Sequence, residues 1–319
     1  MRIKKFSKDI LEFLIIKKKY NLKIDESKAL YPVDLDFTLD DEVNYYHPFD
    51  EHGIPMKVYV SKGKQYNPTR IASYGFAHWG RYQNNSKEIH KQEFMKVLFW
   101  FYQNNHRGLW FYKFEWNTLE KNWISCMAQG EGISILVRGY LLTLEDKYID
   151  LAIKAIEPFK KLVRDKGVAS YLNDNSIFFE EYPTDDPVHV LNGFLYSLIG
   201  LIELKEILEN SAERESEAVD LSTLIDSAIT SLEKNIERWD SGFWSYYDLH
   251  LEGKNIRNIS TIIYHMLHVT QLKYIATKTN NNYLLGVSSR WEKYLNNTNY
   301  RMKALIIKVL YRLKNHAQR

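Results

Sequence analysis

The chain has 319 residues, 45% hydrophobic and 26% charged, which is enough to bury a large core in one or two domains. Its formal net charge of +3 is too balanced for composition alone to indicate a nucleic-acid-binding protein. The low counts of 14 glycines and seven prolines argue against disorder and against an all-β fold with many turns. The unusual feature is aromatic content, because 23 tyrosines, 15 phenylalanines and eight tryptophans make up 14% of the chain.

Residues 1–67 form the first predicted region. Residues 1–30 have the pattern of a short basic amphipathic helix followed by a linker. Prolines and glycines then separate short alternating runs such as Val33–Phe37 and Met56–Val60, which predict one or two β-hairpins. We therefore expect a small N-terminal segment that differs in structure from the rest of the chain.

Two features of the sequence concern the cellular compartment. The apolar run Ile10–Ile16 contains Glu12 and is too short to cross a membrane, and no small-residue cleavage site follows it. The single cysteine, Cys126, excludes an intrachain disulfide and lies among apolar residues, which favours a buried, unreactive thiol. We expect a cytoplasmic protein without a membrane span.

Residues 68–319 are predicted to be helical, because apolar residues recur at intervals of three and four positions. Three such stripes are Phe94, Leu98 and Phe101; Leu191, Leu195, Leu198 and Ile202; and Leu305, Val309 and Leu313. The sequence thus predicts a mainly α fold for this second region.

Internal repetition accompanies the helical pattern. Gly130 and Ser134 recur as Gly193 and Ser197, 63 residues later, each pair near the start of an apolar segment. Polar-faced helices are expected after these segments, for example over 150–162 and 218–239. Recurring helix pairs predict stacked or ring-closed α-hairpins, and a simple helical bundle is the alternative.

A first helix-entry segment begins at Asn67-Pro68, where proline tolerates the first turn of a helix. Tyr66, Arg70, Tyr74 and His78 then fall four residues apart on one face. Of these, Tyr66 and Tyr74 are predicted to be walls of a binding pocket. Taken singly, Tyr74 and His78 are better explained as packed core residues.

A second segment runs from Met127 to Arg138 and includes Gln129. Gly130 and Gly132 each cost roughly 1 kcal/mol of helix stability relative to alanine, which predicts close approach of a neighbouring helix or a ligand. Arg138 lies within an apolar stretch and therefore needs an anion. A carboxylate of the protein is the favoured partner, and an anionic ligand is the alternative.

A third segment carries Glu180, Glu181 and Tyr182 before an apolar helix that contains Asn192. The two glutamates, taken alone, are best explained as surface charges. Tyr182 precedes Pro183, which restricts its backbone to extended conformations and suits a positioned group.

A fourth segment carries Tyr247, His250, Tyr264, His265 and His268. The two last histidines are three apart on a predicted helix and are a candidate metal pair, but no third ligand is evident and we expect no metal. Aromatic, acidic and amide side chains at helix entries favour a sugar-binding pocket.

Seven ordered strings between Gly53 and Leu295 resemble the C-terminal catalytic domain of the D-glucuronyl C5-epimerases. The strings are Tyr66-x-Pro-x-x-Ile-Ala-x-Tyr-Gly75, Met127-Ala-Gln-Gly-x-x-Ile-Ser-x-Leu-Val-Arg138, Glu180-Glu-Tyr-Pro-Thr184, Val190-Leu-Asn-Gly-Phe-x-Tyr-Ser-Leu-Ile-Gly-Leu201, Tyr247-Asp-Leu249, Tyr264-His-x-x-His-x-x-Gln-Leu272 and Arg290-Trp-x-x-Tyr-Leu295. The resemblance implies an incomplete (α/α) toroid over 68–319, preceded by the helix and β-hairpin segment 1–67. It also implies a cofactor-independent isomerase that converts D-glucuronosyl to L-iduronosyl residues in a glycan.

The resemblance implies proton abstraction from C5 of the uronate and return of a proton to the opposite face. The implied catalytic residues are Glu181, Tyr182, Tyr247 and Tyr264. As a base, a tyrosine would need a lowered pKa, so a cation is expected nearby. The residues expected to bind substrate are Tyr66, Arg70, Tyr74, Gln129, Arg138, Asn192, His250, His265 and His268, of which Arg70, Arg138, His265 and His268 are candidates for that cation.

One position departs from the family pattern. The family has an arginine after Tyr-Asp-Leu, and this chain has His250, a weaker and pH-dependent partner for an anion. A uronate glycan other than heparosan is therefore also plausible as the substrate. The expected partner is a uronate-containing glycan rather than nucleic acid or a membrane. Dimerisation in the family depends on more than this domain, so a homodimer stays an open expectation.

Two alternatives to the epimerase remain. A uronate polysaccharide lyase shares abstraction of the C5 proton but then eliminates the 4-O-linked glycan. A glycan-binding protein without catalysis would use the same pocket without moving a proton.

Overall fold

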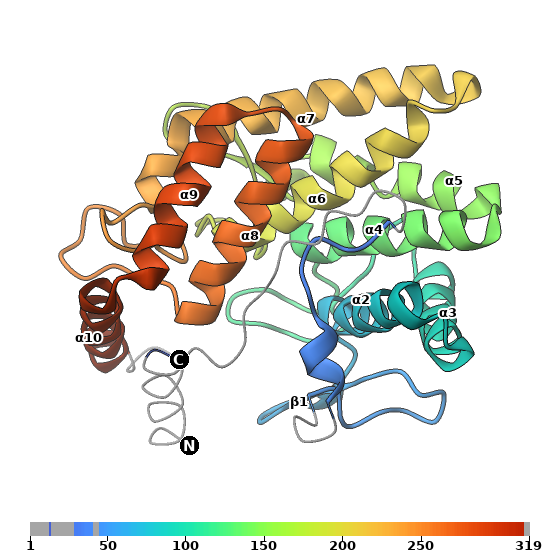
Figure 1. Ribbon diagram of the computed structural model, residues 1–319, viewed down its shortest axis with the longest axis horizontal. Helices are drawn as coiled ribbons and strands as arrows, with labels where there is room; N and C mark the ends of the chain where they lie inside the picture. The colour runs from blue at the N-terminus through green and yellow to red at the C-terminus, as the bar shows by residue number, and fades with distance from the viewer. Residues whose placement is uncertain (1–12, 14–28, 41–44, 316–319) are drawn as a thin grey trace.

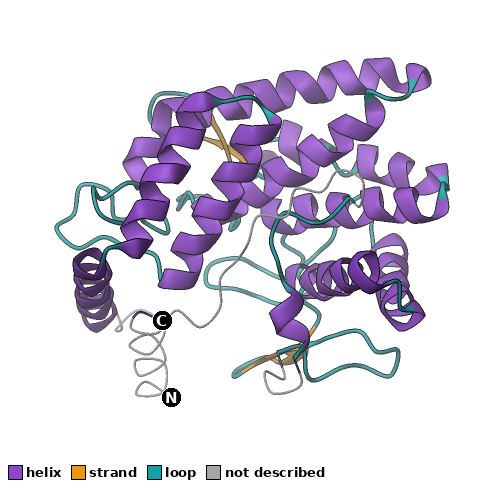
Figure 2. Ribbon diagram, viewed as in Figure 1, coloured by secondary structure: helices purple, strands orange, loops and turns teal. Residues whose placement is uncertain are grey.

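The computed structural model describes residue 13 and residues 29–40 and 45–315. The basic helix expected within 1–30 falls mostly outside these residues. The described chain is mainly helical, as predicted, and its strands are confined to two small antiparallel pairs (Figures 1 and 2).

Consecutive helices form hairpins, and alternate helices pack side by side. The helices are α2 (Pro68–Asn85), α3 (Glu88–Gln103), α4 (Cys126–Thr143), α5 (Asp146–Lys154), α6 (Leu191–Leu208), α7 (Glu215–Asn235), α8 (Ile262–Lys278), α9 (Asn282–Asn296) and α10 (Thr298–Asn315). Helices α2, α4, α6 and α8 contact one another in that order, while α3, α5, α7 and α9 each pack on the helix before them (Figure 1). The predicted helix pairs are therefore present.

The second helices of two predicted pairs differ in detail from the prediction. The helix expected over 150–162 begins earlier, as α5, and gives way to a 3₁₀ turn at Glu157–Lys160. Pro158 lies at the start of that turn and cannot continue an α-helix, because its nitrogen carries no hydrogen. The helix expected over 218–239 is α7, followed by a 3₁₀ turn at Ile236–Trp239.

Among its described residues, the N-terminal segment contains one hairpin, formed by β1 (Lys57–Tyr59) and β2 (Gly63–Gln65). The expectation that Val33–Phe37 forms a strand is wrong, because Asp36–Leu39 is a 3₁₀ turn. Asp34 Oδ1 accepts a hydrogen bond from the Asp36 amide at 3.0 Å, a local bond that competes with strand pairing.

A second hairpin, which the sequence did not predict, joins β3 (Ala169–Tyr171) to β4 (Ile177–Phe179). Strand β4 ends immediately before Glu180. Phe178 and Phe179 are fully buried, so this short strand holds the start of the third helix-entry segment firmly against the core.

Helices α4 and α6 form the centre of the core. Every residue from 191 to 204 is buried, which is the pattern of a helix covered on all sides. A Cβ on Gly130 would lie 2.6 Å from Ser197 Cα, and one on Gly200 would lie 2.1 Å from the carbonyl oxygen of Gly130. A neighbouring helix therefore accounts for Gly130. Gly132 is packed against the Trp110 ring, which a Cβ at this position would approach to 2.4 Å.

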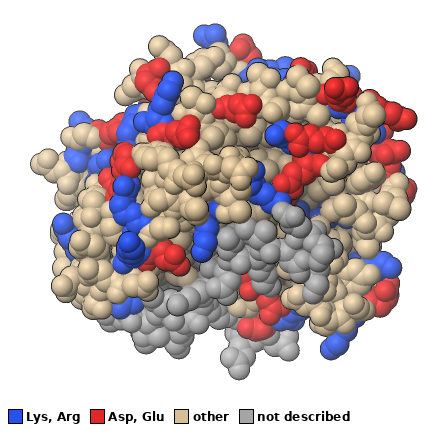
Figure 3. Space-filling model, turned by 45° about the horizontal axis from the view of Figure 1, so that its top comes forward, with Lys and Arg blue, Asp and Glu red and all other residues tan. Residues whose placement is uncertain are grey.

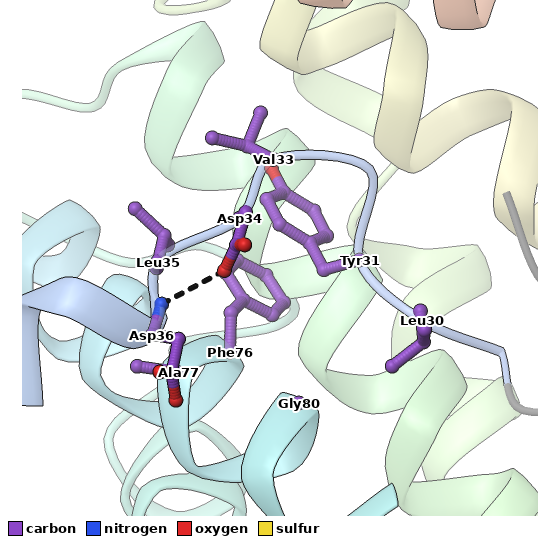
Figure 4. A pocket seen from close by; sticks show the side chains of 9 residues that line it. All are labelled: Leu30, Tyr31, Val33, Asp34, Leu35, Asp36, Phe76, Ala77 and Gly80. Atoms are coloured by element: carbon purple, nitrogen blue, oxygen red, sulfur yellow. Dashed lines mark hydrogen bonds between the residues drawn. The ribbon is translucent and has the colours of Figure 1, made fainter. Parts of the chain in front are cut away.

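The predicted start of α2 is confirmed, since the Asn67 side chain accepts a hydrogen bond from the Arg70 amide at 3.0 Å. The segment 30–36 crosses α2 and encloses a pocket (Figure 4). Its lining residues are Leu30, Tyr31, Val33, Asp34, Leu35, Asp36, Phe76, Ala77 and Gly80. None of the predicted site residues lines this pocket.

The charge pattern of the surface and the burial of the single cysteine agree with what the sequence predicts. Basic and acidic side chains are interspersed on the face shown in Figure 3. None of the helices that the structure describes is both long and apolar enough to cross a membrane. Cys126 is buried, as predicted, and burial raises the pKa of its thiol well above the usual value.

Candidate active site

Four predicted catalytic residues meet in one place, which we call the acid–tyrosine cluster: Glu181, Tyr182, Tyr247 and Tyr264. They come from three segments, namely the end of β4, the loop after α7 and the first turn of α8. The rings of Tyr247 and Tyr264 meet edge to face with centroids 4.9 Å apart. The charge of Glu181 acts on all three phenols, so the four groups lie within electrostatic range of one another.

Backbone hydrogen bonds fix the loop that carries Tyr247. Its amide donates to the Asn258 carbonyl at 2.8 Å, and its own carbonyl accepts from the Leu191 amide at 3.1 Å. On α8, the Thr261 side chain caps the helix by accepting from the Tyr264 amide at 3.4 Å. The tyrosines are thus held by helix ends and paired backbone rather than by free loops.

Glu181 is the buried acid of the cluster, with 8% of its surface exposed. Asn192 Nδ2 donates a hydrogen bond to Glu181 Oε2 at 3.2 Å. A Cβ on Gly193 would lie 2.6 Å from Glu181 Cβ, so only glycine lets the acid pack against the start of α6. Burial raises the pKa of Glu181 to about 7, although hydrogen bonds from Tyr182 and Asn192 act in the opposite direction.

Glu180 is also buried, and it has a different role. Its Oε1 lies 2.7 Å from His189 Nδ1 and 2.5 Å from Ser170 Oγ, and its Oε2 accepts from the His189 amide at 3.2 Å. The interpretation of Glu180 and Glu181 as surface charges is therefore wrong. Glu180 ties β3 to the start of α6, and Glu181 faces the tyrosines.

The phenols of the cluster hold their protons tightly. Burial, followed by the charge of Glu181, raises the pKa values of Tyr182, Tyr247 and Tyr264 above the ordinary value. The expectation of a tyrosine with a lowered pKa beside a cation is wrong for this structure. At neutral pH, Glu181 is the member of the cluster that is poised to exchange a proton.

His265 and His268 belong to a separate group with Ser245, which we call the serine–histidine cluster. Ser245 Oγ lies 2.8 Å from Nδ1 of both rings, and His265 Nε2 lies 3.0 Å from the Trp291 carbonyl oxygen. Burial lowers the pKa of His265 to about 3 and that of His268 well below its usual value. Neither ring therefore supplies the expected cation.

No metal site is apparent among the residues that the structure describes, where no group of three or more His, Cys, Asp or Glu could hold an ion. The candidate pair His265 and His268 shares Ser245 instead. Both histidines help to hold the loop before Tyr247 against α8.

Two residues predicted to bind substrate instead form hydrogen bonds within the core. Arg138 forms two hydrogen bonds with Glu203, of 2.7 and 2.8 Å, so the intramolecular pair is the alternative that the structure contains. Gln129 Oε1 accepts from the Trp110 amide at 3.0 Å, and its Nε2 donates to the Gly108 carbonyl at 2.9 Å. Their polar groups stabilise the fold around α4.

Three of the residues predicted on one face of α2 also have their polar groups bound by other residues of the protein. Tyr74 donates to Glu93 Oε2 at 2.8 Å, and His78 Nδ1 lies 2.9 Å from His90 Nδ1, so both are packed core residues. Tyr66 is partly exposed and donates to Asp50 Oδ2 at 2.6 Å. These three are not brought to the acid–tyrosine cluster.

Arg70 differs from the rest of that face. Its Nη2 donates to the Tyr45 carbonyl, and its guanidinium lies 4.9 Å from the Tyr45 ring centroid. Only 8% of the residue is exposed, and it forms no ion pair with any residue that the structure describes. Tyr45 in turn acts electrostatically on Tyr264, which places Arg70 at the margin of the cluster.

His250 is exposed. Two charged residues of the same region, Asp248 and Lys308, were not predicted as site residues. Asp248 is 6% exposed, and Asn258 Nδ2 donates to its Oδ2. Lys308, from α10, donates to Asn258 Oδ1 at 2.9 Å. The C-terminal helix thus braces the loop of Tyr247, and only the Tyr-Asp-Leu string could have drawn attention to Asp248.

A further buried acid, Glu131, was not predicted as a site residue. It is 2% exposed, and both it and Glu181 act electrostatically on Tyr112. Tyr112 stacks on Trp123 at 4.0 Å, and Trp123 lies 6.0 Å from Tyr182, measured between ring centroids. The signal in the sequence was a charged residue between two glycines of an apolar helix.

Fold and site together define a mainly helical protein with an acid–tyrosine cluster at the entry of its central helices. Within this cluster Glu181 is buried, and the three tyrosines are partly buried. The family model described as "D-glucuronyl C5-epimerase C-terminus" matches residues 103–293, and the chain belongs to this family. All four members of the acid–tyrosine cluster lie within the matched residues.

Two curated relatives bear on this assignment. The chain is 35% identical over 220 residues to the D-glucuronyl C5-epimerase of Caenorhabditis elegans, covering 65% of this chain and 36% of that protein. It is 27% identical over 192 residues to an uncharacterized protein of Methanocaldococcus jannaschii, covering 58% of this chain and 57% of the relative. The chain therefore spans only part of the length of either relative.

Proposed function

We propose that the protein is a carbohydrate epimerase that inverts C5 of D-glucuronosyl residues in a glycan to give L-iduronosyl residues. The observation that carries the proposal is the convergence of Glu181 and three tyrosines from separate segments. Epimerisation at one carbon needs proton-transfer groups on both faces of the sugar. The cluster supplies one acid with a pKa of about 7 and several phenols that remain protonated at neutral pH.

In the proposed reaction, the Glu181 carboxylate is the base, acting through the Tyr182 hydroxyl. The C5–H bond breaks as its proton passes to the phenol oxygen of Tyr182, while the phenol proton passes to Glu181. The electron pair delocalises into the uronate carboxyl group as an enediolate. Tyr264 then donates a proton to the opposite face of C5. Proton exchange with water deprotonates Glu181 and reprotonates Tyr264, and the reverse reaction exchanges the two roles.

Further residues are proposed to bind the glycan around the reacting sugar. Asn192 holds the Glu181 carboxyl, and Arg70 offers a cation without an acidic partner among the described residues to an acidic group of the glycan. His250 stands where the family has an arginine, and we propose that it contacts the glycan from the surface. We further propose that 68–319 is the catalytic unit and that its helix pairs form an arc of an incomplete (α/α) toroid.

The test follows hydrogen at C5 directly. Heparosan is incubated with the protein in heavy water, and NMR measures deuterium at C5 together with the appearance of L-iduronosyl signals. Exchange with an intact chain is the expected result. Ultraviolet absorbance of an unsaturated uronate would favour a lyase, and glycan binding without exchange would favour a binding protein.

A further inference from the structure

Glu131 is a buried acid that the proposed reaction does not use. It lies on α4, is 2% exposed, and its Oε2 has no hydrogen-bond partner among the described residues. Gly130 is packed on the α6 backbone and Gly132 on the Trp110 ring, so the backbone that carries the Glu131 side chain is held in a fixed position. A buried polar atom without a partner is uncommon in native proteins and calls for an explanation.

The surroundings of Glu131 are acidic and phenolic. The groups that act on it or that it acts on are Glu181, Tyr112 and Tyr31. Arg138, the cation that acts on Tyr31, is held by Glu203. No basic side chain among the described residues forms an ion pair with Glu131, and burial together with Glu181 raises the pKa of its carboxyl well above the ordinary value.

A neutral carboxylic acid has a use at such a site. When C5 loses its proton, negative charge grows on a carboxyl group that is already an anion, and the reaction stalls unless that charge is stabilised. A protonated acid can donate a short hydrogen bond to the growing charge. Ketosteroid isomerase works in this way, since an apolar site keeps one of its aspartic acids neutral so that it can donate such a bond.

We propose that Glu131, in its protonated form, donates a hydrogen bond to the carboxylate of the reacting uronate. This inference rests on the proposed function. The proton stays on Glu131 throughout, so the group stabilises the enediolate without taking part in proton transfer. Glu131 would then take part of the task for which the family pattern provides an arginine and this chain provides the exposed His250.

Three proteins separate this role from a structural one: wild type, Glu131→Gln and Glu131→Met. Glutamine keeps a neutral donor of the same shape, and methionine fills the space without a donor. We expect Glu131→Gln to retain C5 exchange within about tenfold and Glu131→Met to lose about a hundredfold or more. Thermal unfolding serves as the control that both variants are folded. Equal rates of C5 exchange in the two variants would overturn the proposal.

A binding measurement keeps the proposal testable without catalysis. Calorimetry measures the affinity of each protein for a heparosan oligosaccharide and for the same oligosaccharide with its carboxyl groups reduced to alcohols. Glu131→Gln should bind the acidic ligand about tenfold more tightly than Glu131→Met, as expected for a hydrogen bond to a charged carboxylate, and this advantage should vanish with the reduced ligand. An advantage that persists with the reduced ligand would contradict the proposed contact.

The two readouts distinguish the failures. If wild type binds the acidic glycan without exchanging C5, the proposed function fails, and the binding comparison alone decides the role of Glu131. If wild type exchanges C5 and the glutamine and methionine variants do so equally, only the inference about Glu131 fails. If wild type neither binds nor exchanges uronate glycans, both are overturned.

Discussion

Two neighbouring residues of α8 belong to two different polar clusters, of which one is partly exposed and the other is fully buried. Tyr264 faces Glu181 and Tyr247, whereas His265 faces Ser245 and the Trp291 carbonyl. In the serine–histidine cluster, Ser245 contacts both rings, and burial keeps the rings neutral. In the acid–tyrosine cluster, Glu181 has a pKa of about 7. Burial disfavours the charged form in both clusters, so it moves the histidine pKa values away from neutral pH and moves the pKa of Glu181 towards it.

The largest expected effect on C5 exchange comes from a substitution in the acid–tyrosine cluster, at Tyr264 on α8. Tyr264→Phe removes one hydroxyl from a packed ring, so we expect C5 exchange to fall by about 10³-fold, within the range for loss of a general acid or base. The matched control is Tyr246→Phe, which removes the hydroxyl next in sequence to Tyr247. Deuterium incorporation measured by NMR compares the two; equal rates in both variants would contradict the assignment.

Substitution of the acid tests the same cluster through stability. A folded-state pKa of about 7, above the ordinary 4.5, means that the folded protein holds this proton more tightly. The stability that Glu181 contributes is therefore full below about pH 4.5 and is lost as the pH rises to about 7. Above pH 7, Glu181→Gln should be more stable than wild type by up to about 3 kcal/mol.

Urea unfolding at pH 5.5 and pH 8 measures this difference. The stability gain from Glu181→Gln should grow between the two pH values. Glu292→Gln, at an exposed position on α9, is the matched control and should show no pH-dependent gain. A gain that is the same at both pH values would show that Glu181 does not titrate in this range.

The smallest expected effect concerns the serine–histidine cluster. Ser245→Ala leaves His265 and His268 without a shared buried partner, which should cost about 1–3 kcal/mol of stability. The pH dependence of C5 exchange should keep its shape, because these rings are neutral in the working range. Urea unfolding and a pH–rate profile check the two statements; a shifted profile would mean that the two clusters share a proton.

The sequence predicted which residues come together in the site better than it predicted their electrostatics. Motifs placed Tyr182, Tyr247 and Tyr264 together because their residue types and order match a family. They could not show that these phenols lie partly buried beside a carboxyl group, where desolvation and the charge of Glu181 raise their pKa values instead of lowering them. Spacing alone also could not tell that Tyr264 and His265 face different clusters, since that depends on how α8 packs.

The fold was likewise predicted in part from the sequence. Apolar spacing predicted the helices because a buried stripe has a regular period, and Asn67 marked the start of α2. The 3₁₀ turn at Asp36–Leu39 escaped prediction because it depends on a side-chain bond from Asp34. Glu131 escaped because its electrostatic interactions are with residues 31, 112 and 181, which no local pattern connects.

The most direct test of the central claim is the titration of Glu181 itself. Protein labelled with ¹³C at the glutamate side-chain carboxyl is followed by NMR from pH 5 to pH 9, and Glu181→Gln assigns the signal by its disappearance. We predict that this signal titrates with a pKa of about 7. A signal that is already fully ionised at pH 5 would contradict the account, because Glu181 would then hold no proton to exchange at neutral pH.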